Sequence, residues 1–130
     1  MSANLKIIDR RKHKRFRAPD GAFTILLQEP HLTLLGKILD ISKGGLSFRY
    51  LDCKKEVSAP SKVGIVLHSR NFYLHNIPVK TVSNIEVMDK KTSNSEVIMR
   101  CSVHFDGLNT EQKIELENFI RNYTTGVLKA

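Results

Sequence analysis

Apolar and polar residues alternate in short runs along most of the chain. Between residues 45 and 50 the alternation places Leu46, Phe48 and Tyr50 on one face of an extended segment, as in a half-buried strand. Similar runs cover residues 22–28, 32–39, 46–51, 63–67, 71–88 and 97–105. Pro78 interrupts the fifth run, which is therefore either one long bent strand or two short ones. Six or so short strands at this spacing predict a small antiparallel barrel or sandwich.

The period of the apolar residues changes after residue 107. They recur there with helical spacing, at Leu116, Phe119, Ile120 and Tyr123. Asn109 or Thr110 can cap the first turn of a helix at this place. The pattern predicts one amphipathic C-terminal helix over about residues 110–124, following a set of strands in residues 22–107.

The net charge of +8 is concentrated near the N-terminus. Residues 1–17 carry seven Lys or Arg against one Asp, and the rest of the chain carries fourteen against twelve. A basic head attracts polyanions such as nucleic acid, acidic lipid or a phosphorylated small molecule, and charge alone does not choose among them. Length and composition indicate one globular domain, with 130 residues of which 41% are hydrophobic. Residues 1–9 show no clear period and are expected to form a flexible lead-in.

Several classes of protein find no support in the sequence. No apolar run approaches the roughly 20 residues that span a bilayer, and the N-terminus lacks the features of a secretory signal. The two cysteines, Cys53 and Cys101, make no disulfide framework, so we expect a cytoplasmic protein with reduced thiols. We see no paired carboxylates, Ser-His-Asp set or metal-ligand spacing, and therefore expect neither an enzyme nor a metal site.

Two short motifs carry the candidate chemistry. The basic segment at residues 10–17 contains R-x-x-x-R as Arg11 and Arg15, and D-x-S-x-x-G follows at residues 40–45, between two predicted strands. An arginine fork can donate two hydrogen bonds to guanine O6 and N7, and can also pair with phosphate. A carboxylate accepts from the donors on the other side of guanine, a serine hydroxyl suits phosphate or sugar, and glycine permits close approach. Together the motifs supply both halves of guanine recognition.

With these motifs in this order, followed by the last strand and the terminal helix, the chain resembles the PilZ domain family over about residues 8–125. PilZ domains are six-stranded antiparallel β-barrels with accessory helices, and most are bacterial receptors for the second messenger cyclic di-GMP. The resemblance implies a mainly β fold, with a PilZ domain at residues 10–125 that contains the barrel and a C-terminal α-helix. It also implies a ligand-binding site formed by Arg11, Arg15, Asp40, Ser42 and Gly45, with Arg10 and Gly44 as neighbours.

The leading hypothesis is a receptor in which cyclic di-GMP docks between the basic segment and the turn at residues 40–45. The two phosphates of the ligand would supply counter-charge to the basic segment and order it over the barrel. The altered surface would then be presented to an unidentified downstream effector protein.

Other interpretations of the same residues stay open. A basic run near a terminus is usually a solvated tail, and D-x-S-x-x-G is often only a turn in which Asp40 caps backbone amides. A nucleic-acid binder with a basic head is one alternative function, and the near-neutral remainder of the chain argues against it. A PilZ-like protein that acts only through protein contacts is another, and the intact motifs argue against that. Arg100 and His104 share one face of the last strand and either line the ligand surface or face solvent.

Overall fold

The computed structural model describes residues 13–27, 33–53, 60–87 and 96–124. The strands in these residues are β1 Phe16–Arg17, β2 Ala22–Leu27, β3 Thr33–Ile41, β4 Gly45–Cys53, β5 Lys62–Leu67, β6 Phe72–Val87 and β7 Glu96–Phe105. The helices are the short 3-10 helix η1 His68–Arg70 and the α-helix α2 Thr110–Tyr123. The predicted lead-in at residues 1–9 lies outside the described residues.

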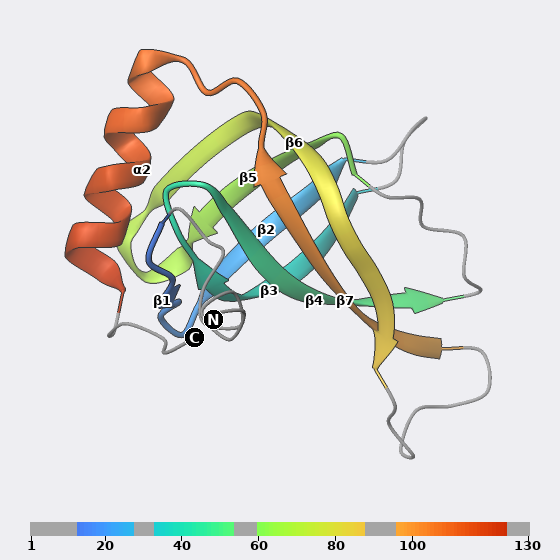
Figure 1. Ribbon diagram of the computed structural model, residues 1–130. Coiled ribbons are helices and arrows are strands. Elements are labelled where there is room, and N and C mark those ends of the chain that lie inside the picture. Colours follow the sequence, from blue (N-terminus) through green and yellow to red (C-terminus); the bar gives the residue numbers. More distant parts are fainter. Residues whose placement is uncertain (1–12, 28–32, 54–59, 88–95, 125–130) are drawn as a thin grey trace, which may run out of the picture.

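All the strand pairings are antiparallel, and the sheet closes on itself (Figure 1). The hydrogen-bonded order is β1-β3-β2-β5-β6-β7-β4, and a further pairing between β3 and β4 completes the ring. Strands β2 to β7 therefore form the predicted six-stranded antiparallel barrel. The two-residue β1 pairs with Asp40 and Ile41 of β3, beyond the part of β3 that pairs with β2.

The hydrophobic core fills the inside of this barrel. Leu46, Phe48 and Tyr50 are all buried, which confirms the inner face predicted from their alternation. The apolar run around Pro78 forms one continuous strand, β6. The prediction of one long bent strand is therefore correct, and that of two short strands is wrong. The pairing of β6 shifts register once against β5 and once against β7, and such irregularities let a long strand bend around a barrel.

The helix α2 packs beside β6 and begins at a complete capping box. The side chain of Asn109 accepts from the backbone N–H of Gln112, and the side chain of Gln112 accepts from the backbone N–H of Asn109. Leu116, Phe119 and Ile120 are buried, and the rings of Phe119 and Phe72 lie 5.2 Å apart between centroids. The C-terminal helix is thereby confirmed. Among the helices of the described residues, none is long and apolar enough to cross a membrane.

Candidate functional site

An irregularity in β3 turns Asp40 to the outside of the barrel. Ile38 pairs with Phe48 and Asp40 pairs with Ser47, so Leu39 is one extra residue, as in a β-bulge. Paired residues of antiparallel strands point to the same face. Ile38 therefore faces the core with Phe48, whereas Asp40 shares the outer face with Ser47. Simple alternation would have placed Ile38 and Asp40 on the same side.

Asp40 is buried on this outer face by contacts with two side chains. The hydroxyl of Ser47 donates to Asp40 Oδ2 at 2.8 Å, and Arg15 Nη2 lies 2.7 Å from Asp40 Oδ1. The Arg15 contact is an ion pair in which no N–H is aligned on the oxygen, and Oδ1 accepts no hydrogen bond from the described residues. β1 holds Arg15 in place, because it pairs with β3 and the N–H of Ala18 donates to the carbonyl of the bulged Leu39 at 3.1 Å.

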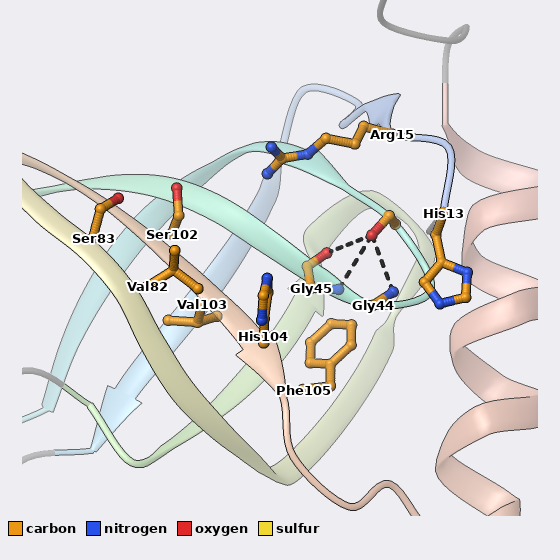
Figure 2. A pocket seen from close by; sticks show the side chains of 11 residues that line it. His13, Arg15, Gly44, Gly45, Val82, Ser83, Ser102, Val103, His104 and Phe105 are labelled. Carbon is orange, nitrogen blue, oxygen red and sulfur yellow. Dashed lines mark hydrogen bonds between the residues drawn. The ribbon is translucent and has the colours of Figure 1, made fainter. Parts of the chain in front are cut away.

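Ser42 organises the connection between β3 and β4. Its hydroxyl accepts from the backbone N–H groups of Gly44 at 3.0 Å and Gly45 at 3.2 Å, as the dashed lines in Figure 2 show. The same hydroxyl donates to the carbonyl of Gly45 over a longer 3.4 Å. Ser42, not Asp40, therefore caps the amides of the turn, which corrects the alternative weighed from the sequence. Both lone pairs of the Ser42 hydroxyl accept hydrogen bonds within the turn. The hydroxyl can therefore bind a ligand only as a donor, by rotating its proton away from the carbonyl of Gly45.

The two glycines of the turn serve different contacts. A Cβ on Gly45 would lie 2.1 Å from the carbonyl oxygen of Val103, so the approach of β4 to β7 requires glycine there. A Cβ on Gly44 would lie 2.8 Å from Cδ2 of His13, whose side chain is exposed. The imidazole of His13 thus contacts the turn. It belongs to residues 13–17, which we call the N-terminal segment.

A cleft of about 540 Å³ opens between the N-terminal segment, the turn and the β6–β7 pair (Figure 2). It is lined by His13, Arg15, Ser42, Gly44, Gly45, Val82, Ser83, Ser102, Val103, His104 and Phe105. A row of paired polar residues on the outer face reaches this cleft, because Asp40 pairs with Ser47, Ser47 with Ser102, and Ser102 with Ser83. Of this row, Ser102 and Ser83 line the cleft. The volume is in the range of small-molecule sites.

Among the described residues, the two titratable groups with shifted pKa values belong to the core and do not line the cleft. Burial raises the pKa of the Cys101 thiol to about 11. Burial also raises the pKa of Tyr50, whose hydroxyl donates to Asn84 Oδ1 at 2.9 Å. No group of three or more His, Cys, Asp or Glu that could hold a metal ion occurs in the described part of the chain.

Comparisons with known proteins identify the family and the fold of this chain. A family model described as the PilZ domain matches residues 9–122. The chain belongs to the PilZ family. Among curated proteins, no sequence matches it.

Solved PilZ structures share the fold at low sequence identity. The PilZ domain of YcgR from Escherichia coli, solved with c-di-GMP, has 20% identity and a TM-score of 0.68, and the match covers 88% of this chain and 92% of that one. MrkH from K. pneumonia in complex with c-di-GMP has 18% identity and a TM-score of 0.65, over 88% of this chain and 52% of that one. This PilZ chain therefore spans about half the length of MrkH, and 45% of a longer YcgR structure.

The structure of this PilZ domain brings together most of the residues that the motifs indicated. Arg15, Ser42, Gly44 and Gly45 line the cleft, and Asp40 lies directly behind Arg15. Arg10 and Arg11 lie outside the described residues. The sequence left open whether Arg100 and His104 of the last strand line the ligand surface or face solvent. His104 lines the cleft and is also exposed, whereas Arg100 is exposed and does not line the cleft.

Several residues that line the cleft of this PilZ domain were missed in the sequence. They are His13, Val82, Ser83, Ser102, Val103 and Phe105. The alternation of β7 places Ser102 on the same face as His104, which is a signal that could have indicated it. Ser83 could not be found in this way, because its place depends on the register between β6 and β7.

Proposed function

We propose that this chain is a cyclic di-GMP receptor, which binds the dinucleotide in the cleft between its basic N-terminal segment and the β3–β4 turn. The observation that carries the proposal is the meeting of Arg15 with Asp40 at the edge of this cleft. These two side chains come from the two motifs, and they combine a donor fork with a carboxylate, as guanine recognition requires. The c-di-GMP complexes of YcgR and MrkH, which share the fold, support the same ligand.

Both charged groups retain hydrogen-bonding capacity for a ligand. The guanidinium of Arg15 has five N–H donors, and its ion pair within the described residues is with Asp40 through Nη2. We therefore expect other donors of Arg15 to bind guanine O6 and N7 or phosphate. Asp40 Oδ1 is buried behind Arg15 without an aligned hydrogen bond, which costs free energy. If Arg15 turns from Asp40 to the ligand, the N–H donors of a guanine edge would offset that cost.

The proposed binding residues are Arg10, Arg11, Arg15, Asp40, Ser42, Gly44 and Gly45, joined by Ser83, Ser102 and His104. Arg10 and Arg11 belong to the basic segment that leads into Arg15, and the ligand's two phosphates would balance their charge. Binding would then order this segment over the barrel and change the surface that a downstream effector protein meets.

Calorimetric titration with cyclic di-GMP tests the site. Arg15→Ala removes the donor fork, and we expect its affinity to fall about tenfold or more, since hydrogen bonds to charged groups are worth about 1.5–3 kcal/mol. Lys14→Ala is the matched control, because Lys14 is adjacent, equally charged, exposed and absent from the lining of the cleft. Absence of binding by the wild-type chain, or equal affinities for Arg15→Ala and Lys14→Ala, would contradict the proposal.

A further inference from the structure

Three cations lie side by side on the outer face of the barrel. Lys37 of β3 pairs with Arg49 of β4, and Arg49 pairs with Arg100 of β7. All three side chains are exposed, and we call this set the cation row. Arg49 and Arg100 lie two residues along their strands from Ser47 and Ser102, a distance of about 7 Å in a strand. The cation row therefore runs beside the polar row that reaches the cleft.

The cation row is unfavourable for the isolated fold. Like charges directly opposite one another on paired strands repel. The ion pairs found within the described residues join Arg15 to Asp40 and Lys43 to Glu117, and neither involves the cation row. Within the described residues, no ion pair to an acidic side chain is therefore found for these three cations. An external anionic partner would reduce their mutual repulsion.

Exposed aliphatic side chains flank the cation row on the same face. Ile85 pairs directly with Arg100 and is 58% exposed. Leu51 is 44% exposed and lies two residues beyond Arg49, and Leu35 is 62% exposed and lies two residues before Lys37. Residues two apart on a strand share a face, so these aliphatic groups and the cations form one surface. We call this surface, made of the cation row with Leu35, Leu51 and Ile85, the outer sheet face.

The composition of the outer sheet face distinguishes among anionic partners. Nucleic acid is held mainly by cations, hydrogen-bond donors and stacking aromatics, and exposed leucine and isoleucine add nothing to that contact. A membrane accepts apolar groups that protrude into it, whereas these aliphatic groups lie within strands beside charged neighbours. Arginine among aliphatic side chains is instead suited to a protein interface, with an apolar centre and charge complementarity.

We propose that the outer sheet face docks an acidic amphipathic segment of a partner protein. Carboxylates of that segment would lie along Lys37, Arg49 and Arg100, and its aliphatic side chains would cover Leu51 and Ile85. The inference does not depend on which ligand occupies the cleft. It predicts that an effector protein would bind the outer sheet face through acidic and aliphatic side chains.

The test uses a fluorescent helical peptide that carries one stripe of glutamates flanked by leucines, titrated against the whole chain. The wild-type chain is expected to bind it about tenfold more tightly than a matched peptide with glutamine in place of every glutamate. Arg49→Glu with Arg100→Glu should weaken binding of the glutamate peptide by about tenfold or more. Lys62→Glu with Lys113→Glu is the control, since these exposed lysines lie off the outer sheet face and the net charge changes equally. That control should stay within about threefold of the wild type.

Folding of each variant is checked by circular dichroism. In the Arg49/Arg100 charge-reversal variant the new charge at position 49 attracts Lys37, whereas the like charges at positions 49 and 100 still repel, so its stability should stay close to that of the wild type. Arg49→Gln with Arg100→Gln is a milder second variant, which should also lose the preference for glutamate. Equal weakening in both charge-reversal variants would overturn the proposal, and so would tighter binding of a single-stranded oligonucleotide or of anionic vesicles. Loss of cyclic di-GMP binding in the Arg49/Arg100 variant would also overturn it, by making the cation row part of the ligand site.

Discussion

Ser42 and Gly45 illustrate how single residues set the geometry of the cleft. The hydroxyl of Ser42 holds the amides of Gly44 and Gly45, and this fixes the turn that forms one wall. Gly45 lets β4 approach β7 closely enough for the N–H of Phe105 to donate to the carbonyl of Gly44 at 2.9 Å. The serine and glycine of the D-x-S-x-x-G motif thus fix the backbone conformation of the turn. Any contact of the motif with a ligand depends on that conformation.

Alanine at position 45 is expected to destabilise the fold. The new Cβ would meet the carbonyl oxygen of Val103 at 2.1 Å, and overpacking of this kind costs about 1–3 kcal/mol of unfolding free energy. Urea denaturation of Gly45→Ala measures this loss. Gly44→Ala is the control and should cost less, about 0.5 kcal/mol, since its Cβ meets the movable end of His13. Equal effects of the two variants would show that the contact with Val103 is unimportant.

Among the secondary-structure elements, β3 does most to assemble the site. Its bulge at Leu39 keeps Ile38 and Ile41 in the core while Asp40 faces outward. The carbonyl of Leu39 also accepts from Ala18, so the same irregularity ties the N-terminal segment to the barrel. One strand thereby joins the two motifs, which are far apart in the sequence.

The capping box gives α2 a local source of stability that can be measured. Asn109→Ala removes the side-chain acceptor for the N–H of Gln112, and we expect a loss of about 1 kcal/mol in unfolding free energy. Asn118→Ala is the control, because Asn118 is exposed within the helix and alanine is the better helix former there. Thermal or urea unfolding of the pair should place Asn109→Ala below the wild type and Asn118→Ala at or above it. The reverse order would mean that α2 does not depend on this cap.

For the whole molecule, the central question is whether ligand binding orders the basic segment. Hydrogen exchange at labelling times of seconds to minutes measures this, because barrel strands are protected on that timescale with or without ligand. Cyclic di-GMP is expected to slow exchange within residues 10–17, since its phosphates balance the positive charge of that segment. Arg15→Ala should abolish the slowing at the same ligand concentration. If the ligand binds while exchange of the segment is unchanged, the receptor works without this ordering step.

Much of the fold could be predicted because it depends on local period. The alternation of Leu46, Phe48 and Tyr50 indicated a buried inner face, and the spacing of Leu116, Phe119 and Ile120 indicated a helix. The motifs also indicated four of the residues that line the cleft. Ser102 could have been indicated by its alternation with His104 on the last strand. Ser83 could not, because it meets Ser102 only when β6 and β7 pair in one particular register.

The sequence by itself therefore determined the set of strands, the terminal helix and the two motifs, because each depends on residues that are near neighbours in the chain. Only the tertiary structure decided that Arg15 meets Asp40 and that Lys37, Arg49 and Arg100 lie in a row. Those contacts depend on a bulge, on strand register and on closure of the barrel. All three are set by pairing between distant residues, and a one-residue shift in that pairing turns a side chain to the opposite face.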